Sequence, residues 1–244
     1  PAALLQDESA RGAGCALATA DRVDEARLRR GDVAPEPLDV VHVLGACARQ
    51  AADAEQAQRL ALTSRAFHND RFGPLCKKLA DMVGYQKVLL MNSGAEAVET
   101  AIKAARRWGY EKKGVPQDHA EIVVFDGNFH GRTTTIVSFS TDPDSRVGYG
   151  PFTPGFKVAA YGDPKAAAAL MGPNTAAVLV EPIQGEGGDN HFRREFLQAL
   201  RDLADEADFL LIFDEVQTGF ATTGRWWCFE HFGVEPDVFA FAKK

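Results

Sequence analysis

Apolar residues along this chain follow two patterns, which predict strands and helices in turn. Short runs dominated by apolar and β-branched residues are typical of strands that are buried on both faces of a sheet. These runs predict strands at 88–91, 122–125, 134–139, 158–160, 176–181, 209–213 and 238–241. A loop is expected at 126–132, and a glycine- and proline-rich surface loop at 148–155.

Between these runs, apolar residues recur at the spacing of an amphipathic helix. In the stretch 73–83, Leu75, Leu79 and Met82 lie at i, i+4 and i+7. Ser93 and Glu96 have the spacing of a capping box and predict the start of a second helix. This second helix is predicted to run to about Trp108, and further helices are predicted at 164–171 and 193–206. Strands that alternate with helices predict an α/β fold with a mainly parallel sheet.

The first 56 residues carry a weaker pattern. Pro35 and Pro37 interrupt any helix, 40–44 is the one plausible strand, and 46–60 is at best a weak helix. Apolar residues are too sparse there to bury a face, so a flexible or poorly packed segment is expected. Residues 1–56 are therefore left unassigned, as either disordered or read out of frame, and 57–244 are expected to form the main domain.

Composition narrows the class of protein. The 244 residues are 45% hydrophobic and 25% charged, as in ordinary globular proteins. The formal net charge of -7 argues against binding to nucleic acid, and no apolar run is long enough to span a membrane. Four cysteines without a CxxC pair, and histidines without HExxH spacing, argue against a disulfide framework or a metal enzyme. The cytoplasm is the expected compartment.

Charged residues stand where two predicted strands end. The run 209–213 stops at Asp214, and the run 238–241 is followed by Lys243 and Lys244. In parallel sheets, ligands bind outside the carboxyl ends of the strands, so this acid and amine would face one crevice. Taken singly, each charge is better explained as a strand-end charge that reaches water.

The turn before the second helix adds an anion site. Ser93, Gly94 and Ala95 offer backbone N–H groups at a helix N-terminus, where the helix dipole also favours a phosphate. The chain lacks both a Walker motif and the GxGxxG turn of a nucleotide-binding dehydrogenase. Pyridoxal phosphate (PLP) needs an anion site, an amine and a carboxylate beside its ring nitrogen. These three features together predict a PLP site, in which Phe129 is available to cover the ring.

A series of short motifs between residues 62 and 244 supports this interpretation. They are LTSRAF (62–67), MNSGAE (91–96), RWGY (107–110), GNFHGR (127–132), STDP (140–143), GPF (150–152), EPIQGE (181–186) and DEVQTG (214–219), with Lys243 after them. In this order and spacing, about three quarters of the chain resembles a class III aminotransferase of the ornithine aminotransferase type. The resemblance implies the large domain of the PLP-dependent transferase fold type I, with helices flanking a mainly parallel sheet.

The resemblance also implies roles for individual residues. Lys243, rather than Lys244, would form the Schiff base with the cofactor and act with Asp214 in catalysis. The residues implied to hold PLP are Ser93, Gly94 and Ala95 at the phosphate, Phe129 and Val216 on the two ring faces, Asp214 at the ring nitrogen, and Gln217 at the ring hydroxyl. Arg132 would anchor a substrate carboxylate, and Glu186 would pair with an arginine nearer the C-terminus. His130 is interpreted as a packing residue.

The implied reaction transfers the terminal amine of ornithine to 2-oxoglutarate and yields glutamate 5-semialdehyde and glutamate. The stretches 187–193 and 240–244 are more similar to lysine ε-aminotransferase, so that substrate stays open. The chain looks truncated after Lys243, and Ala242 replaces the usual glycine, so a non-catalytic fragment is the alternative from another class. The implied partners are small amino acids and 2-oxo acids, with a homodimer for the full-length form.

Overall fold

The computed structural model describes residues 52–59 and 67–243, and it divides the chain into two compact units, Pro1–Gly84 and Tyr85–Lys244. The strand suggested at 40–44 and nearly all of the unassigned segment lie outside the described residues. In the first unit, residues 52–59 are helical and helix α3 spans Phe72–Val83. This confirms the helix predicted at 73–83, which ends at Gly84 in the left-handed conformation.

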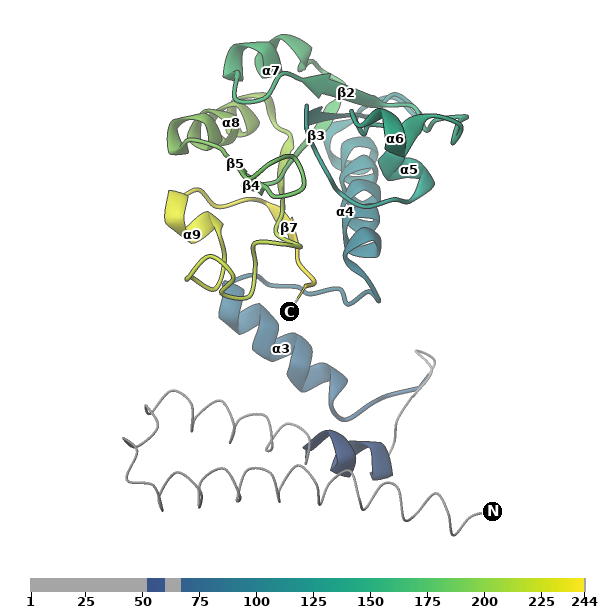
Figure 1. Cartoon of the computed structure of the whole chain (residues 1–244), viewed down its shortest axis with the longest axis vertical. Helices are drawn as coiled ribbons and strands as arrows, with labels where there is room; N and C mark the ends of the chain where they lie inside the picture. The colour runs from purple at the N-terminus through teal and green to yellow at the C-terminus, as the bar shows by residue number, and fades with distance from the viewer. Residues whose placement is uncertain (1–51, 60–66, 244) are drawn as a thin grey trace, which may run out of the picture. The chain divides into compact units, whose positions relative to one another are not determined.

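In the described part of the second unit, a parallel five-stranded sheet forms the centre (Figure 1). Its strand order is β2-β1-β3-β6-β7, and every neighbouring pair is parallel. The strands are β1 (Glu121–Phe125), β2 (Phe156–Ala159), β3 (Thr175–Val180), β6 (Leu210–Asp214) and β7 (Val238–Ala240). The chain runs outward from β1 to β2 and then returns to the other side of β1. Such sheets bind ligands beside the point where the strand order reverses, in the crevice outside the carboxyl ends of the strands.

Helices cover both faces of this sheet (Figure 1). Helix α4 (Gly94–Trp108) packs on one face, where its side chains Val98, Ile102 and Ala105 join Val124 and Ile212 in the hydrophobic core. Helices α7 (Pro164–Leu170) and α8 (Arg194–Ala207) lie on the other face. Their bounds confirm the helices predicted from the apolar spacing. Because both faces are covered, all six residues of β3 are buried, as its continuous apolar run predicts.

Two predicted strands are wrong. Residues 88–91 form no strand, and Leu89 is 67% exposed, so this apolar run is not the doubly buried strand that its sequence predicts. Residues 134–137 of the predicted strand 134–139 instead form the short helix α5 (Thr134–Val137). The Thr133 side chain accepts a hydrogen bond from the Ile136 N–H, and this N-cap outweighs the β-propensity of the β-branched run.

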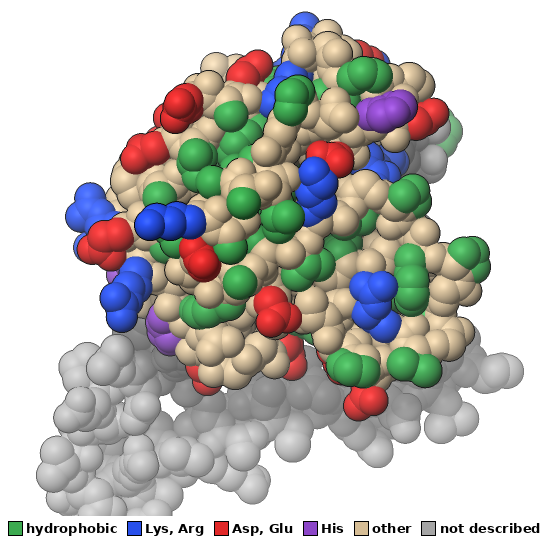
Figure 2. Space-filling model, turned by 90° about the horizontal axis from the view of Figure 1, so that it is seen from above, with side chains coloured by type: hydrophobic (Ala, Val, Ile, Leu, Met, Phe, Trp, Pro, Cys, Tyr) green, Lys and Arg blue, Asp and Glu red, His purple; other side chains and the backbone are tan. Residues whose placement is uncertain are grey.

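Shorter elements complete the second unit. They are the π-helix Gly109–Lys113, α6 (Pro143–Arg146), the antiparallel pair β4 (Ile183–Gln184) and β5 (Asn190–His191), and α9 (Phe229–Phe232). No helix in the described part of the chain has the length and apolar character needed to cross a membrane. On the face shown in Figure 2, acidic and basic side chains are interspersed.

Candidate functional site

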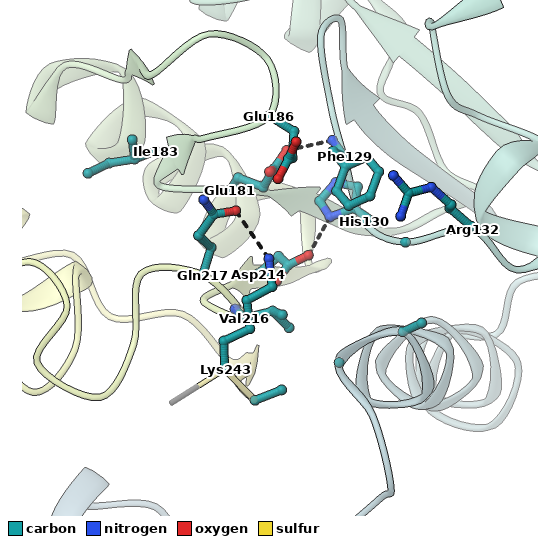
Figure 3. Close-up of a pocket in the computed structure, with 14 residues that line it drawn as sticks. Phe129, His130, Arg132, Glu181, Ile183, Glu186, Asp214, Val216, Gln217 and Lys243 are labelled. Atoms are coloured by element: carbon teal, nitrogen blue, oxygen red, sulfur yellow. Dashed lines mark hydrogen bonds and ion pairs between the residues drawn. The ribbon is translucent and has the colours of Figure 1, made fainter. Parts of the chain in front are cut away.

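A pocket of about 330 Å³ opens at the carboxyl ends of the parallel strands (Figure 3). Its volume is at the lower end of the range for small-molecule sites. Its walls come from the loop after β1, the segment after β3, the end of β6, the segment after β7 and the start of α4. Nine of the ten residues predicted for the site line it: Gly94, Ala95, Phe129, Arg132, Glu186, Asp214, Val216, Gln217 and Lys243.

Pairing between β6 and β7 brings the predicted acid and amine to this pocket. Asp214 lies opposite Ala240 in the register, so Lys243 follows three residues beyond the paired position. The Lys243 backbone N–H donates to the Val216 carbonyl over 3.1 Å, which ties the segment after β7 to the segment after β6. The Lys243 Nζ lies 3.4 Å from the Gln217 Oε1, and the side chain is exposed to the pocket.

The N-terminus of α4 contributes backbone rather than side-chain groups. The Ser93 hydroxyl accepts the Glu96 N–H, which confirms the capping pair, and Ser93 is the predicted residue that does not line the pocket. The Glu96 carboxylate accepts the Asn92 N–H over 2.8 Å, and this hydrogen bond lowers the pKa of Glu96. At Gly94, a Cβ would lie 2.6 Å from Val216 Cγ1, so only glycine leaves the helix end open.

Several hydrogen bonds and one cation–π contact hold the loop after β1. The Gly127 N–H donates to Thr141 Oγ1 over 2.9 Å, and the Asn128 side chain donates to two backbone carbonyls. The Phe129 N–H donates to Glu181 Oε2 over 2.9 Å. The Arg132 guanidinium carbon lies 4.9 Å from the centre of the Phe129 ring, within the range of a cation–π contact. This anchoring places the Phe129 ring and Arg132 at the pocket (Figure 3).

Three buried titratable side chains meet at the pocket: His130, Glu181 and Asp214. The His130 Nδ1 lies 2.7 Å from Asp214 Oδ2. Burial opposes the charged imidazolium, but Asp214 and Glu181 outweigh it and raise the pKa of His130. Burial also raises the pKa of Glu181, to about 7.

From the sequence, His130 is predicted to be a packing residue, and no role is predicted for Glu181. In the structure, the His130 ring is hydrogen-bonded to Asp214, the acid predicted to face the ring nitrogen. Glu181 carries the same signal as Asp214, an acid directly after a buried strand, and that signal was available at 176–181.

A lysine, a buried acid on the adjacent strand and a helix N-terminus around one strand-end pocket are the arrangement of a PLP-dependent aminotransferase. The class-III aminotransferase family model matches residues 43–244, and the chain belongs to that family. Enzymes of this family depend on PLP.

The chain is similar to several named aminotransferases. The ornithine aminotransferase of Bordetella pertussis is 55% identical over 193 residues, which cover 79% of this chain and 47% of the relative. The crystal structure of ornithine aminotransferase from Toxoplasma gondii matches with a TM-score of 0.76 at 48% identity, over 78% of this chain and 46% of that one. Acetylornithine aminotransferase from Elizabethkingia anophelis matches with a TM-score of 0.67 at 49% identity, over 78% and 47%. The chain spans about half the length of the curated relatives it matches.

Proposed function

We propose that the whole protein is an ornithine 5-aminotransferase, which transfers the terminal amine of ornithine to 2-oxoglutarate. The products are glutamate 5-semialdehyde and glutamate. The observation that carries the proposal is the identity of 48–55% to relatives named ornithine aminotransferase, over the part of the chain that forms the pocket. The same proposal takes residues 57–244 as the cofactor-binding domain.

The residues of the pocket fit PLP. Gly94 leaves open a helix end that any side chain would fill, and such an end suits a phosphate. The pocket also offers a carboxylate at Asp214 and an amine at Lys243, the two groups that the cofactor requires. In the proposal, the backbone of Ser93, Gly94 and Ala95 holds the phosphate.

The remaining predicted contacts are with the pyridine ring of PLP. Phe129 and Val216 cover its two faces, and Gln217 contacts the ring hydroxyl. Asp214 faces the ring nitrogen. All four side chains line the pocket, which supports these assignments.

When bound, PLP supplies an electron sink for the carbanion that forms when a proton leaves the substrate. Lys243 holds the cofactor and, once freed, its Nζ moves the proton at the amine-bearing carbon of the substrate. The neighbouring Gln217 Oε1, 3.4 Å from Nζ, orients the amine toward the pocket. Asp214 keeps a proton on the ring nitrogen through its negative charge.

Substrate binding is assigned to Arg132 and Glu186, which both line the pocket. Arg132, held over Phe129, anchors a substrate carboxylate through its planar guanidinium. Glu186 carries the opposite charge. In the proposal it forms an ion pair with an arginine nearer the C-terminus of the whole protein, and it moves aside when a substrate α-carboxylate binds.

A covalent trapping experiment tests the cofactor assignment. The chain is incubated with PLP, reduced with borohydride and digested, and the modified peptide is identified by mass spectrometry. We expect the label on Lys243, its loss in Lys243→Ala and its retention in the matched control Lys244→Ala. A label that persists in Lys243→Ala contradicts the assignment. A chain that takes up no PLP favours the non-catalytic alternative.

A competition of substrates tests the choice of amine donor. Ornithine, lysine and N-acetylornithine are compared at equal concentration with 2-oxoglutarate, using the whole protein. The third substrate is included because the Elizabethkingia anophelis match is named acetylornithine aminotransferase. The highest kcat/KM is expected for ornithine, with parallel lines in double-reciprocal plots because the two half-reactions share one site. A higher kcat/KM for either rival would replace ornithine in the proposal.

We also propose that the full-length form is a cytoplasmic homodimer. Val147 and Tyr149 support a contact surface, because both are large apolar side chains that are more than 60% exposed. Sedimentation velocity of the whole protein is expected to give the mass of a dimer, and cell fractionation is expected to place it in the cytoplasm. A monomer at micromolar concentration, or recovery in another fraction, would overturn the respective part.

A further inference from the structure

The proposed mechanism gives no task to His130, although its ring is joined to Asp214. The two side chains are 1% and 5% exposed, and Nδ1 lies 2.7 Å from Oδ2. An ionised carboxylate only accepts hydrogen bonds, so the proton of this bond resides on Nδ1. The other oxygen of Asp214, Oδ1, accepts the Val216 N–H over 2.9 Å. Each oxygen of the buried acid therefore already has one fixed donor.

The His130 ring is held in place without help from a second hydrogen bond. Its Nε2 is buried and has no partner in the described part of the chain. Its backbone neighbours are fixed instead, since the Phe129 N–H donates to Glu181 and a Cβ at Gly131 would meet Ala95 Cβ at 2.9 Å. The imidazole also contacts the Phe139 ring, at 5.8 Å between centroids. The orientation of the ring thus serves its bond to Asp214.

We propose that His130 is a positioning residue for Asp214: its Nδ1–H holds one carboxylate oxygen so that the acid presents its remaining acceptor capacity to the ring nitrogen of PLP. The inference rests on the proposed function, in which Asp214 faces that nitrogen. A charge-assisted hydrogen bond between buried groups is stronger and more directional than a neutral one. Glu181 places a second negative group near the imidazole, which supports its cationic form. In this proposal His130 acts through Asp214 and not directly on the substrate.

The test compares PLP with its 1-deaza analogue, which has carbon in place of the ring nitrogen. Both aldehydes react with Lys243 alike, so the ratio of their dissociation constants isolates the contact at the nitrogen. The ratio is measured by fluorescence titration for the unaltered chain, Asp214→Asn, His130→Phe and His130→Asn. Phe keeps an aromatic ring without the donor, whereas Asn offers an N–H close to the position of Nδ1. His191→Asn, at an exposed histidine on β5, is the matched control.

We expect the unaltered chain to prefer PLP and the preference to fall about tenfold in His130→Phe, toward the value of Asp214→Asn. The His130→Asn variant should recover most of the preference, and His191→Asn should keep all of it. If His130→Phe keeps the preference of the unaltered chain, His130 does not act on Asp214 and the inference is wrong. Absence of any preference in the unaltered chain would overturn both the proposed contact of Asp214 and the inference.

A measurement on the unaltered chain covers the case in which His130→Phe does not fold. The ring nitrogens of His130 are followed by ¹⁵N NMR. We expect a protonated Nδ1 whose signal shifts on addition of PLP and shifts less with the 1-deaza analogue. An unprotonated Nδ1, or equal shifts with both compounds, would refute the role of His130.

Discussion

Replacement of Glu215 by glutamine should change how the stability of the chain depends on pH. Glu215 is 1% exposed, and its two oxygens accept the N–H groups of Cys228 and Phe229 over 2.7 and 2.8 Å. Burial raises the pKa of this carboxyl to about 7, although the two N–H donors oppose the rise. The ordinary pKa of this group is 4.5. Between pH 4.5 and about pH 7, Glu215 therefore holds its proton in the folded state but loses it in the unfolded state.

The sign of the effect follows from this proton balance. Because the folded state holds more protons, its stability falls as the pH rises from about 4.5 to about 7. A pKa difference of this size corresponds to about 3 kcal/mol. Glutamine does not titrate, so Glu215→Gln removes this pH-dependent loss of stability. The glutamine side chain has one acceptor oxygen, so the variant also loses one of the two hydrogen bonds at every pH. Relative to the unaltered chain, the variant should gain about 2.5 kcal/mol between pH 5 and pH 8.

The measurement is the free energy of unfolding by guanidinium chloride at several pH values, without cofactor, followed by circular dichroism. Glu181, whose pKa is also raised to about 7, is present in both proteins and cancels in the difference. Glu206→Gln, at an exposed carboxyl on α8, is the control and should show no comparable gain. If Glu215→Gln instead loses stability relative to the unaltered chain as the pH rises, the carboxylate is stabilised in the fold and the reasoning is refuted.

Three further substitutions test the packing and capping around the pocket. Gly94→Val should weaken PLP binding at least about tenfold, because even its Cβ would overlap Val216; an unchanged dissociation constant in a titration would contradict this. Ser93→Ala removes the N-cap of α4 and should lower the free energy of unfolding by about 1 kcal/mol in chemical denaturation. Asn128→Ala removes the side-chain donor from two buried carbonyls and should cost about 2 kcal/mol in the same assay. A loss smaller for Asn128→Ala than for Ser93→Ala would reverse the ranking that burial predicts.

Much of the fold can be predicted from the sequence, because many of its helices and strands depend on local chemistry. The continuous apolar run of β3 predicts a strand buried on both faces, and the Ser93–Glu96 spacing predicts the start of α4. The stretch 88–91 has an equally apolar sequence, but it forms no strand, since an apolar run alone does not decide whether residues join a sheet. The error at α5 has a different origin, since a single capping hydroxyl on Thr133 reversed the preference of the residues after it.

The sequence by itself determined the chemistry that this chain carries: an acid and an amine after two buried strands, a turn suited to phosphate and the motifs of its family. The tertiary structure decided how those groups are supported. The bond from His130 to Asp214 joins residues 84 positions apart, and the bond from Phe129 to Glu181 joins residues 52 apart. Such pairs depend on strand order and on the path of the loop after β1. Burial then raises the pKa of Glu181, and neighbouring carboxylates raise the pKa of His130, and no local pattern records either effect.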